Sequence, residues 1–207
     1  MNPGTQKEAV ELFEAVKNGV KNAKAEVVVC PPFVYVSSFK LQASGIKLGA
    51  QNVSLEPKGA FTSQVSAAQL KDLGVEYVIV GHSESRKHLH ETNEEISQKI
   101  KIVLETGMKP ILCIDNEKQI PKGLSSDVII AYEPLWAIGT GKSCEPSDVQ
   151  KMAGVIKDLA GDVKILYGGS VNSQNAKAYL AVVNGLLVGG ASLKAEEFVK
   201  IVESASV

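Results

Sequence analysis

Two short segments of the chain carry residues that could transfer protons. In AYEPLWAIGTGKS, residues 131–143, Glu133 ends an apolar run and is followed by a proline, a tryptophan and two spaced glycines, a combination that suits a movable segment beside a fixed acid. In VIVGHSESR, residues 78–86, Gly81 and His82 end another apolar run. Carboxylate and imidazole groups are common general acids and bases. Taken alone, each is equally compatible with a solvated charge at a strand end or a hydrogen-bonded structural histidine.

Two glycine-rich turns could hold an anion. YGGSV (167–171) and VGGAS (188–192) each follow a strand-like run. Paired glycines let a ligand approach the backbone closely, and peptide N–H groups at the start of a following helix bind an anion without a formal positive charge. Each motif alone is also explained as a tight turn between a strand and a helix. Their joint occurrence with His82 and Glu133 favours a phosphate site.

The composition favours a small ligand held by local groups. A formal charge of -1 and a pI near 6.3 give no basic field that would attract nucleic acid or an anionic membrane. The N-terminal stretch does not read as a signal peptide, and no run approaches the roughly 20 apolar residues of a membrane span, so we expect a cytoplasmic protein. Cys30, Cys113 and Cys144 lie far apart, so we expect no metal site.

Short, nearly continuous apolar runs recur along the chain and predict strands buried on both faces. These runs are residues 26–30, 46–50, 76–81, 109–114, 127–133, 163–168 and 185–189. Such burial is typical of parallel sheets. A helical pattern with one apolar face covers residues 5–20, and helical patterns with start and stop signals cover residues 92–107 and 145–161. The alternation predicts an α/β fold of repeated strand–helix units, in one domain that spans residues 1–207.

Two irregularities distinguish this pattern from a regular barrel. Residues 115–126 alone join two predicted strands, which is close to the minimum for a parallel crossover. We therefore expect the covering helix of this fifth crossover to be lost or reduced to a turn. The chain also begins with a predicted helix, and seven strands are visible where a closed (β/α)8 barrel needs eight.

With these motifs in place, the sequence closely resembles the triosephosphate isomerase family. GHSESR, AYEPLWAIGTGKS, YGGSV and LVGGASL occur in the family's order, and the match extends over essentially the whole chain. AQNV (50–53) and GAFTSQVS (59–66) also resemble its third-strand and dimer-loop segments. The resemblance implies a TIM (β/α)8-type barrel, interconversion of dihydroxyacetone phosphate and glyceraldehyde 3-phosphate, a homodimer, and no cofactor or metal.

The resemblance also assigns roles to individual residues. Glu133 is implied to be the base that takes a carbon-bound proton and returns it to the adjacent carbon. His82 is implied to polarise the carbonyl as a neutral imidazole, with Glu84 as a supporting acid. Residues 137–142 are implied to form a lid whose closure excludes water. The residues implied to contact the substrate phosphate are Gly139, Ser170, Gly189 and Gly190.

The sequence departs from the family pattern at several internal positions. Ser85 stands where the family usually has the first of two arginines, so we expect a structural ion pair to be missing. Ser63 and Gln64 replace the glycine and glutamate of the dimer loop, although Thr62 remains. We therefore expect the details of the dimer interface to be altered.

The start of the sequence departs most. MNPGT fits only the end of the family's first strand, which closes with Asn-Trp-Lys-Met-Asn, so the catalytic lysine and its neighbouring asparagine are absent. We expect residues 26–30 and 185–189 to lack a strand partner, and this chain to have little or no activity without the lysine. A non-catalytic relative kept for phosphate binding or interaction, and a different phosphosugar barrel enzyme, stay open as alternatives.

Overall fold

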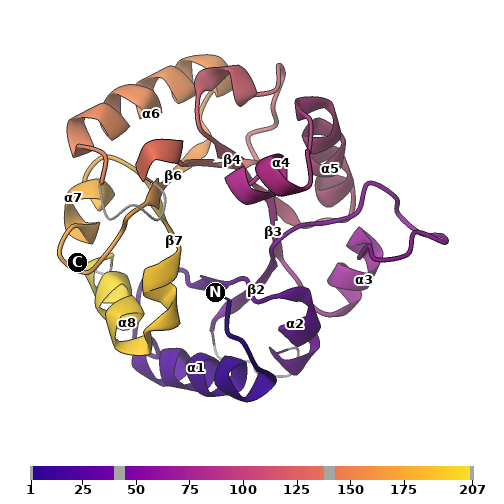
Figure 1. Cartoon of the computed structure of the whole chain (residues 1–207). Coiled ribbons are helices and arrows are strands. Elements are labelled where there is room, and N and C mark those ends of the chain that lie inside the picture. The colour runs from indigo at the N-terminus through magenta and orange to yellow at the C-terminus, as the bar shows by residue number, and fades with distance from the viewer. Residues whose placement is uncertain (1, 40–44, 138–142, 206–207) are drawn as a thin grey trace.

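The computed structural model describes residues 2–39, 45–137 and 143–205, which form a curled parallel sheet ringed by helices (Figure 1). Within these residues the sheet has seven strands that pair in sequence order, each parallel to the next. The strands are β1 (Val28–Val29), β2 (Lys47–Ala50), β3 (Tyr77–Val80), β4 (Lys109–Ile114), β5 (Ile129–Tyr132), β6 (Lys164–Gly169) and β7 (Gly185–Val188). The predicted α/β barrel fold with seven visible strands is confirmed.

Helices follow most strands and cover the outer face of the sheet (Figure 1). The α-helices are α1 (Gln6–Gly19), α2 (Phe33–Phe39), α3 (Ala67–Asp72), α4 (Ser83–His88), α5 (Asn93–Glu105), α6 (Pro146–Ala160), α7 (Ala176–Leu180) and α8 (Ala195–Ser204). The starts of α1 and α5 follow from their sequences: Thr5 and Thr92 cap them through side-chain oxygens, and Glu95 completes a capping box. The three predicted helices are all present.

The crossover between β4 and β5 is reduced as the sequence predicted. Its helical part within the described residues is a single 3-10 turn, η1 (Glu117–Gln119). Two further 3-10 turns, η2 (Leu135–Ala137) and η3 (Gly190–Leu193), follow β5 and β7. The crossover that lies next to Glu133 is therefore a short loop, not a covering helix.

The sheet has a seam between β1 and β7, which are not paired with each other within the described residues. The strands at the seam are only partly covered: every residue of β7 is half-buried, whereas β3 is fully buried. On the outer side of the seam, α1 packs against α8, and this contact closes the ring of helices (Figure 1). A Cβ added to Gly19 would lie 2.4 Å from Val199 Cγ2, so glycine allows this close approach.

Alternate residues of the strands face two different cores. Val78, Val80 and Leu112 pack between the sheet and the helices, whereas Tyr77 and Ile111 belong to a separate cluster on the other face of the sheet. Because all strands are parallel, their carboxyl ends meet at one face of the ring. No helix in the described ranges is long and apolar enough to cross a membrane.

Candidate active site

His82 occupies the junction between β3 and α4. Gly81 before it has φ of +67°, and a Cβ there would lie 3.0 Å from Ile96 Cδ1, so this turn requires glycine. His82 is the N-cap of α4: its Nδ1 accepts the backbone N–H of Glu84 at 3.3 Å. A ring nitrogen that accepts a hydrogen bond carries no proton, so the imidazole is neutral with its proton on Nε2.

Glu133 directly follows β5 and is only 6% exposed. Its backbone N–H donates to Ile114 O at 2.8 Å, which extends the pairing of β4 and β5 one residue beyond the strand. Glu133 Oε2 lies 3.6 Å from His82 Nε2, just beyond hydrogen-bonding distance. This oxygen is buried and has no hydrogen-bond partner within the described part of the chain. The structure thus places a proton acceptor opposite a proton donor.

The surroundings of Glu133 make it a stronger base than an exposed glutamate. Burial raises the pKa of its carboxyl above the usual value, and this is the largest effect. A hydrogen bond from the Cys113 thiol lowers the pKa of Glu133, whereas the negative charge of Glu84 raises it. A buried, raised-pKa carboxylate at the end of a barrel strand is typical of a catalytic base.

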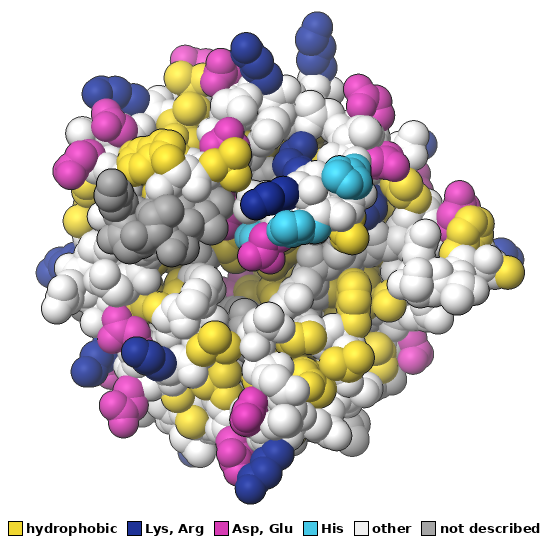
Figure 2. Space-filling model, viewed as in Figure 1, with side chains coloured by type: hydrophobic (Ala, Val, Ile, Leu, Met, Phe, Trp, Pro, Cys, Tyr) yellow, Lys and Arg dark blue, Asp and Glu magenta, His cyan; other side chains and the backbone are white. Residues whose placement is uncertain are grey.

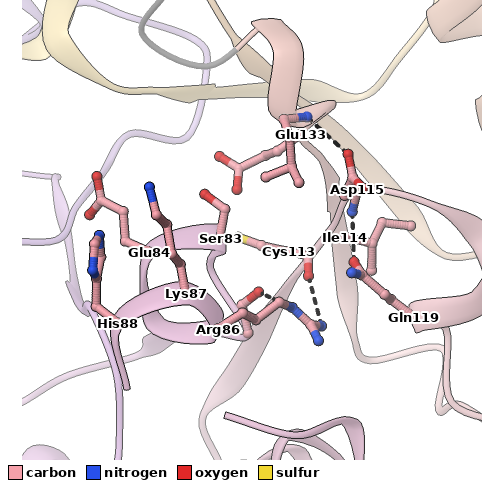
Figure 3. A pocket seen from close by; sticks show the side chains of 12 residues that line it. Ser83, Glu84, Arg86, Lys87, His88, Cys113, Ile114, Asp115, Gln119 and Glu133 are labelled. Atoms are coloured by element: carbon pink, nitrogen blue, oxygen red, sulfur yellow. Dashed lines mark hydrogen bonds between the residues drawn. The ribbon is translucent and has the colours of Figure 1, made fainter. Parts of the chain in front are cut away.

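A cleft of about 530 Å³ opens beside Glu133, between α4 and the segment that follows β4 (Figure 3). Glu84 and Lys87 extend along its α4 side, while Asp115 lies on the opposite side. Glu84 Oε2 is 3.9 Å from His82 Nδ1, so this predicted supporting acid does lie beside the imidazole. In Figure 2, basic, acidic and histidine side chains gather over α4 next to the hollow at the centre of this face.

The ends of the predicted lid are held by side chains from β6, from the turn after β6 and from α7. Ser170 Oγ donates to Ala137 O at 2.9 Å, at the end of η2. Beyond residues 138–142, Cys144 N–H donates to Tyr167 Oη at 3.1 Å, and Tyr179 Oη donates to Cys144 O at 2.6 Å. Gly139, one of the predicted phosphate contacts, lies outside the described residues. Ser170 is a second predicted phosphate contact, and its hydroxyl donates to Ala137 O at the first end of the lid.

The two glycine-rich turns lie side by side, because Gly169 of β6 is in register with Val188 of β7. Gly189 and Gly190 are exposed, and a Cβ at either would meet open space within 4 Å. They do not line the cleft beside Glu133, and neither does Ser170. The structure therefore brings His82, Glu84 and Glu133 together, with the predicted anion-binding turns on the neighbouring strand ends.

Three residues of the site had not been singled out from the sequence. Arg86 donates to Gly81 O at 2.7 Å and to Cys113 O at 3.4 Å, which ties α4 to the ends of β3 and β4. Cys113 contacts Glu133 from a position that looked like ordinary core. Lys87 lines the cleft and makes no hydrogen bond or ion pair within the described ranges. In the sequence, the sign of a role for Arg86 and Lys87 was their position shortly after His82. The missing ion pair expected at Ser85 stays a prediction.

Gly168 makes room for the Glu133 side chain, and we expect Gly168→Ala to impair proton transfer by Glu133. A Cβ at this position would lie 2.6 Å from both Glu133 Cγ and Oε1, although the backbone φ is outside the left-handed region. The carboxylate must therefore shift, and a misplacement near 1 Å can cost about 10²-fold in rate. We expect kcat to fall by roughly tenfold to a hundredfold, measured by steady-state kinetics.

Gly154→Ala is the matched control for this substitution. Gly154 lies inside α6, and a Cβ there would have no neighbour within 4 Å. This variant should keep full activity and gain about 0.5–1 kcal/mol of stability, as alanine does in a helix. A Gly168→Ala protein with kcat within twofold of the wild type would show that the base tolerates the methyl group.

Comparisons with known proteins agree on one family. The sequence model described as TIM, triosephosphate isomerase, matches residues 1–205. A triosephosphate isomerase from Alkaliphilus oremlandii is 40% identical over 230 residues, covering 95% of this chain and 93% of the relative. That of Aquifex aeolicus is 42% identical over 233 residues, covering 97% of this chain and 94% of the relative. That of Caldanaerobacter subterraneus is 41% identical over 232 residues, covering 96% of this chain and 94% of the relative.

Proposed function

The chain belongs to the triosephosphate isomerase family, and from this premise we propose that it interconverts dihydroxyacetone phosphate and D-glyceraldehyde 3-phosphate through an enediolate. The observation that carries the proposal is the pair formed by His82 and Glu133. A buried carboxylate oxygen without a hydrogen-bond partner in the described residues lies 3.6 Å from the protonated nitrogen of a neutral imidazole. Aldose–ketose isomerisation needs one base and one hydrogen-bond donor in this arrangement.

The reaction can be followed atom by atom at this pair. Glu133 takes a proton from C1 of the ketose, and the electron pair moves through C1–C2 onto the carbonyl oxygen O2. His82 Nε2–H donates to O2, where the negative charge develops, and gives up its proton there. The imidazole then recovers a proton from the hydroxyl on O1. Protonated Glu133 returns its proton to C2, which leaves the aldehyde at C1. The raised pKa of Glu133 favours the first step, since a stronger base takes the carbon-bound proton more readily.

The substrate phosphate is proposed to bind at Gly189, Gly190 and Ser170, with Gly139 contributing from the lid. The exposed glycines leave space for an anion next to backbone amides. Ser170 has a single hydroxyl proton, and that proton is donated to Ala137 O in this structure. A phosphate that accepts the same proton therefore competes with the bond to Ala137 O, which couples phosphate binding to the end of η2.

Two observations support weak activity of the 207-residue polypeptide on its own. Within the described residues, β1 and β7 each pair on one side only, and His82 and Glu133 have no cationic side chain between them. Arg86 donates to two backbone carbonyls and to Asn93 Oδ1, and Lys87 extends along the α4 side of the cleft, next to Glu84. An anionic enediolate stabilised by a neutral histidine alone should form slowly. The same observations favour the second candidate, a non-catalytic phosphate-binding protein.

A coupled assay that starts from glyceraldehyde 3-phosphate tests the proposal. We would compare the 207-residue polypeptide with a form extended by a strand ending in Asn-Trp-Lys, and with the same extension carrying Met in place of that lysine. We expect the lysine-containing extension to be the fastest of the three. Full activity of the 207-residue form would contradict the argument from the missing cation. Inactivity of every form, with retained phosphate binding, would favour the non-catalytic candidate.

We also propose that the protein is a cytoplasmic homodimer that acts on a small phosphorylated triose. The loop between β2 and α3 projects from the molecule (Figure 1), and Phe61 within it is 43% exposed. An exposed aromatic side chain on a projecting loop suits burial in a partner. Light scattering after size-exclusion chromatography measures the oligomeric state directly.

A further inference from the structure

The loop that replaces a crossover helix places one of its side chains on the segment that carries Glu133. Asp115 directly follows β4, and its Oδ1 accepts the backbone N–H of Leu135 at 2.9 Å (Figure 3). Leu135 is the first residue of η2, two positions after Glu133. The bond thus joins the shortened crossover to the start of the lid.

The Asp115 carboxylate takes over where the pairing of β4 with β5 ends. The backbone N–H of Glu133 donates to Ile114 O, and N–H groups of successive residues in an extended segment point to opposite sides, so the next donor on the β4 side is Leu135 N–H. This N–H meets the carboxylate of Asp115 in place of a backbone carbonyl. Consecutive residues at the end of β4 therefore hold the backbone on both sides of Pro134.

Asp115 is itself fixed by the turn that replaces the helix. Its backbone N–H donates to Gln119 Oε1 at 2.7 Å, and its Oδ2 accepts from Asn116 Nδ2 at 3.3 Å. Asn116 in turn caps η1, since its side chain accepts the N–H of Lys118. An acceptor with its own orientation fixed gives a bond of defined direction.

Building on the proposed function, we propose that Asp115 is a positioning residue that holds Glu133 in its working orientation through the N–H of Leu135. In this role Asp115 need not touch the substrate or the reacting atoms. It acts by fixing the backbone around Pro134, and the bond from Ser170 to Ala137 O holds the other end of η2. The segment that follows the base is thereby anchored at both ends of η2.

Three variants test this role in the form of the protein that shows isomerase activity. Asp115→Ala removes the acceptor, Asp115→Asn keeps an oxygen acceptor without the charge, and Asp127→Ala removes an exposed aspartate before the other end of β5. We expect Asp115→Ala to lower kcat about tenfold or more with little change in KM, because the defect lies in orientation and not in substrate binding. Asp115→Asn should recover most of kcat, and Asp127→Ala should match the wild type.

A spectroscopic readout separates this inference from the proposed function. Trp136 is the single tryptophan of the chain and lies in η2. Its fluorescence anisotropy should fall in Asp115→Ala, recover in Asp115→Asn and stay unchanged in Asp127→Ala, whether or not the protein catalyses isomerisation. Wild-type kcat and an unchanged Trp136 signal in Asp115→Ala would overturn the positioning role. An inactive wild type with the expected Trp136 changes would count against the proposed function alone.

Discussion

Replacing Glu133 with glutamine should lower the isomerase rate by about 10²- to 10⁴-fold, the usual contribution of a general base. Glutamine has nearly the same shape but cannot accept a carbon-bound proton. The substitution leaves His82 and the glycine turns in place, so phosphate binding should survive. Steady-state kinetics in the active form of the protein, together with binding of inorganic phosphate, measures both effects.

The same variant should be more stable than the wild type at neutral pH. The folded-state pKa of Glu133 is raised by burial, so the folded state binds its proton more tightly than the unfolded state does. The stability contributed by this group is fully present below the unfolded pKa and is lost as pH rises through the folded pKa. Glutamine avoids that loss, and its advantage should disappear on acidification. Urea unfolding of both proteins across a pH series measures the difference.

Glu105→Gln provides the control for both measurements. Glu105 lies at the end of α5 with an exposed side chain, 3.8 Å from Lys101. Surface pairs of this kind contribute about 0–1 kcal/mol, so rate and stability should change little. The assignment of Glu133 as the base fails if Glu133→Gln retains a tenth or more of the wild-type kcat.

Replacing His82 with asparagine should cost about 10²- to 10³-fold in kcat, as the loss of one donor to a developing oxyanion does. Asparagine is a good N-cap residue, so its oxygen can accept the N–H of Glu84 in place of Nδ1. Its short side chain cannot place a donor where Nε2 lies. The variant thus removes the donor that faces Glu133 and keeps the cap, and thermal unfolding should show an unchanged midpoint.

His90→Asn is the matching control. His90 follows α4 and has φ of +57°, a conformation that asparagine tolerates better than most residues. The kcat of the His90→Asn variant should match that of the wild type. If His82→Asn instead lost stability in step with activity, the histidine would be a cap and not a proton donor.

The regular parts of this fold were predictable because they obey strong local patterns. Continuous apolar runs located all seven strands of the described sheet, the spacing of apolar residues located α1, and start and stop signals located α5 and α6. The short helices α2, α3, α4 and α7 were not located, because five to seven residues hold too few turns for a helical period to show. Strand ends were less predictable. The strand predicted over residues 26–30, which lies at the seam, is only Val28–Val29 in the structure.

The candidate site was predictable where its residues fall within motifs. His82 and Glu133 could be singled out from their positions after strands, and the structure brings them together. The anion-binding role of the two glycine turns stays a prediction. Asp115 could not be singled out, because its contact with Leu135 depends on how the shortened crossover folds back. The contact of Gly168 with Glu133 likewise depends on the register of β5 and β6, which no local pattern reports.

The packing of α1 on α8 has a consequence for how the molecule assembles. Gly19 and Val199 lie near opposite ends of the sequence, so their contact forms only after the intervening strand–helix units have come together. Contacts of such long sequence separation form late in folding and carry a large loop-closure cost. Without a strand ladder across the seam in the described residues, local opening there is resisted by side-chain packing, in which α1, α8 and Val27 share one buried cluster. The seam is therefore where the native state should exchange its amide hydrogens first.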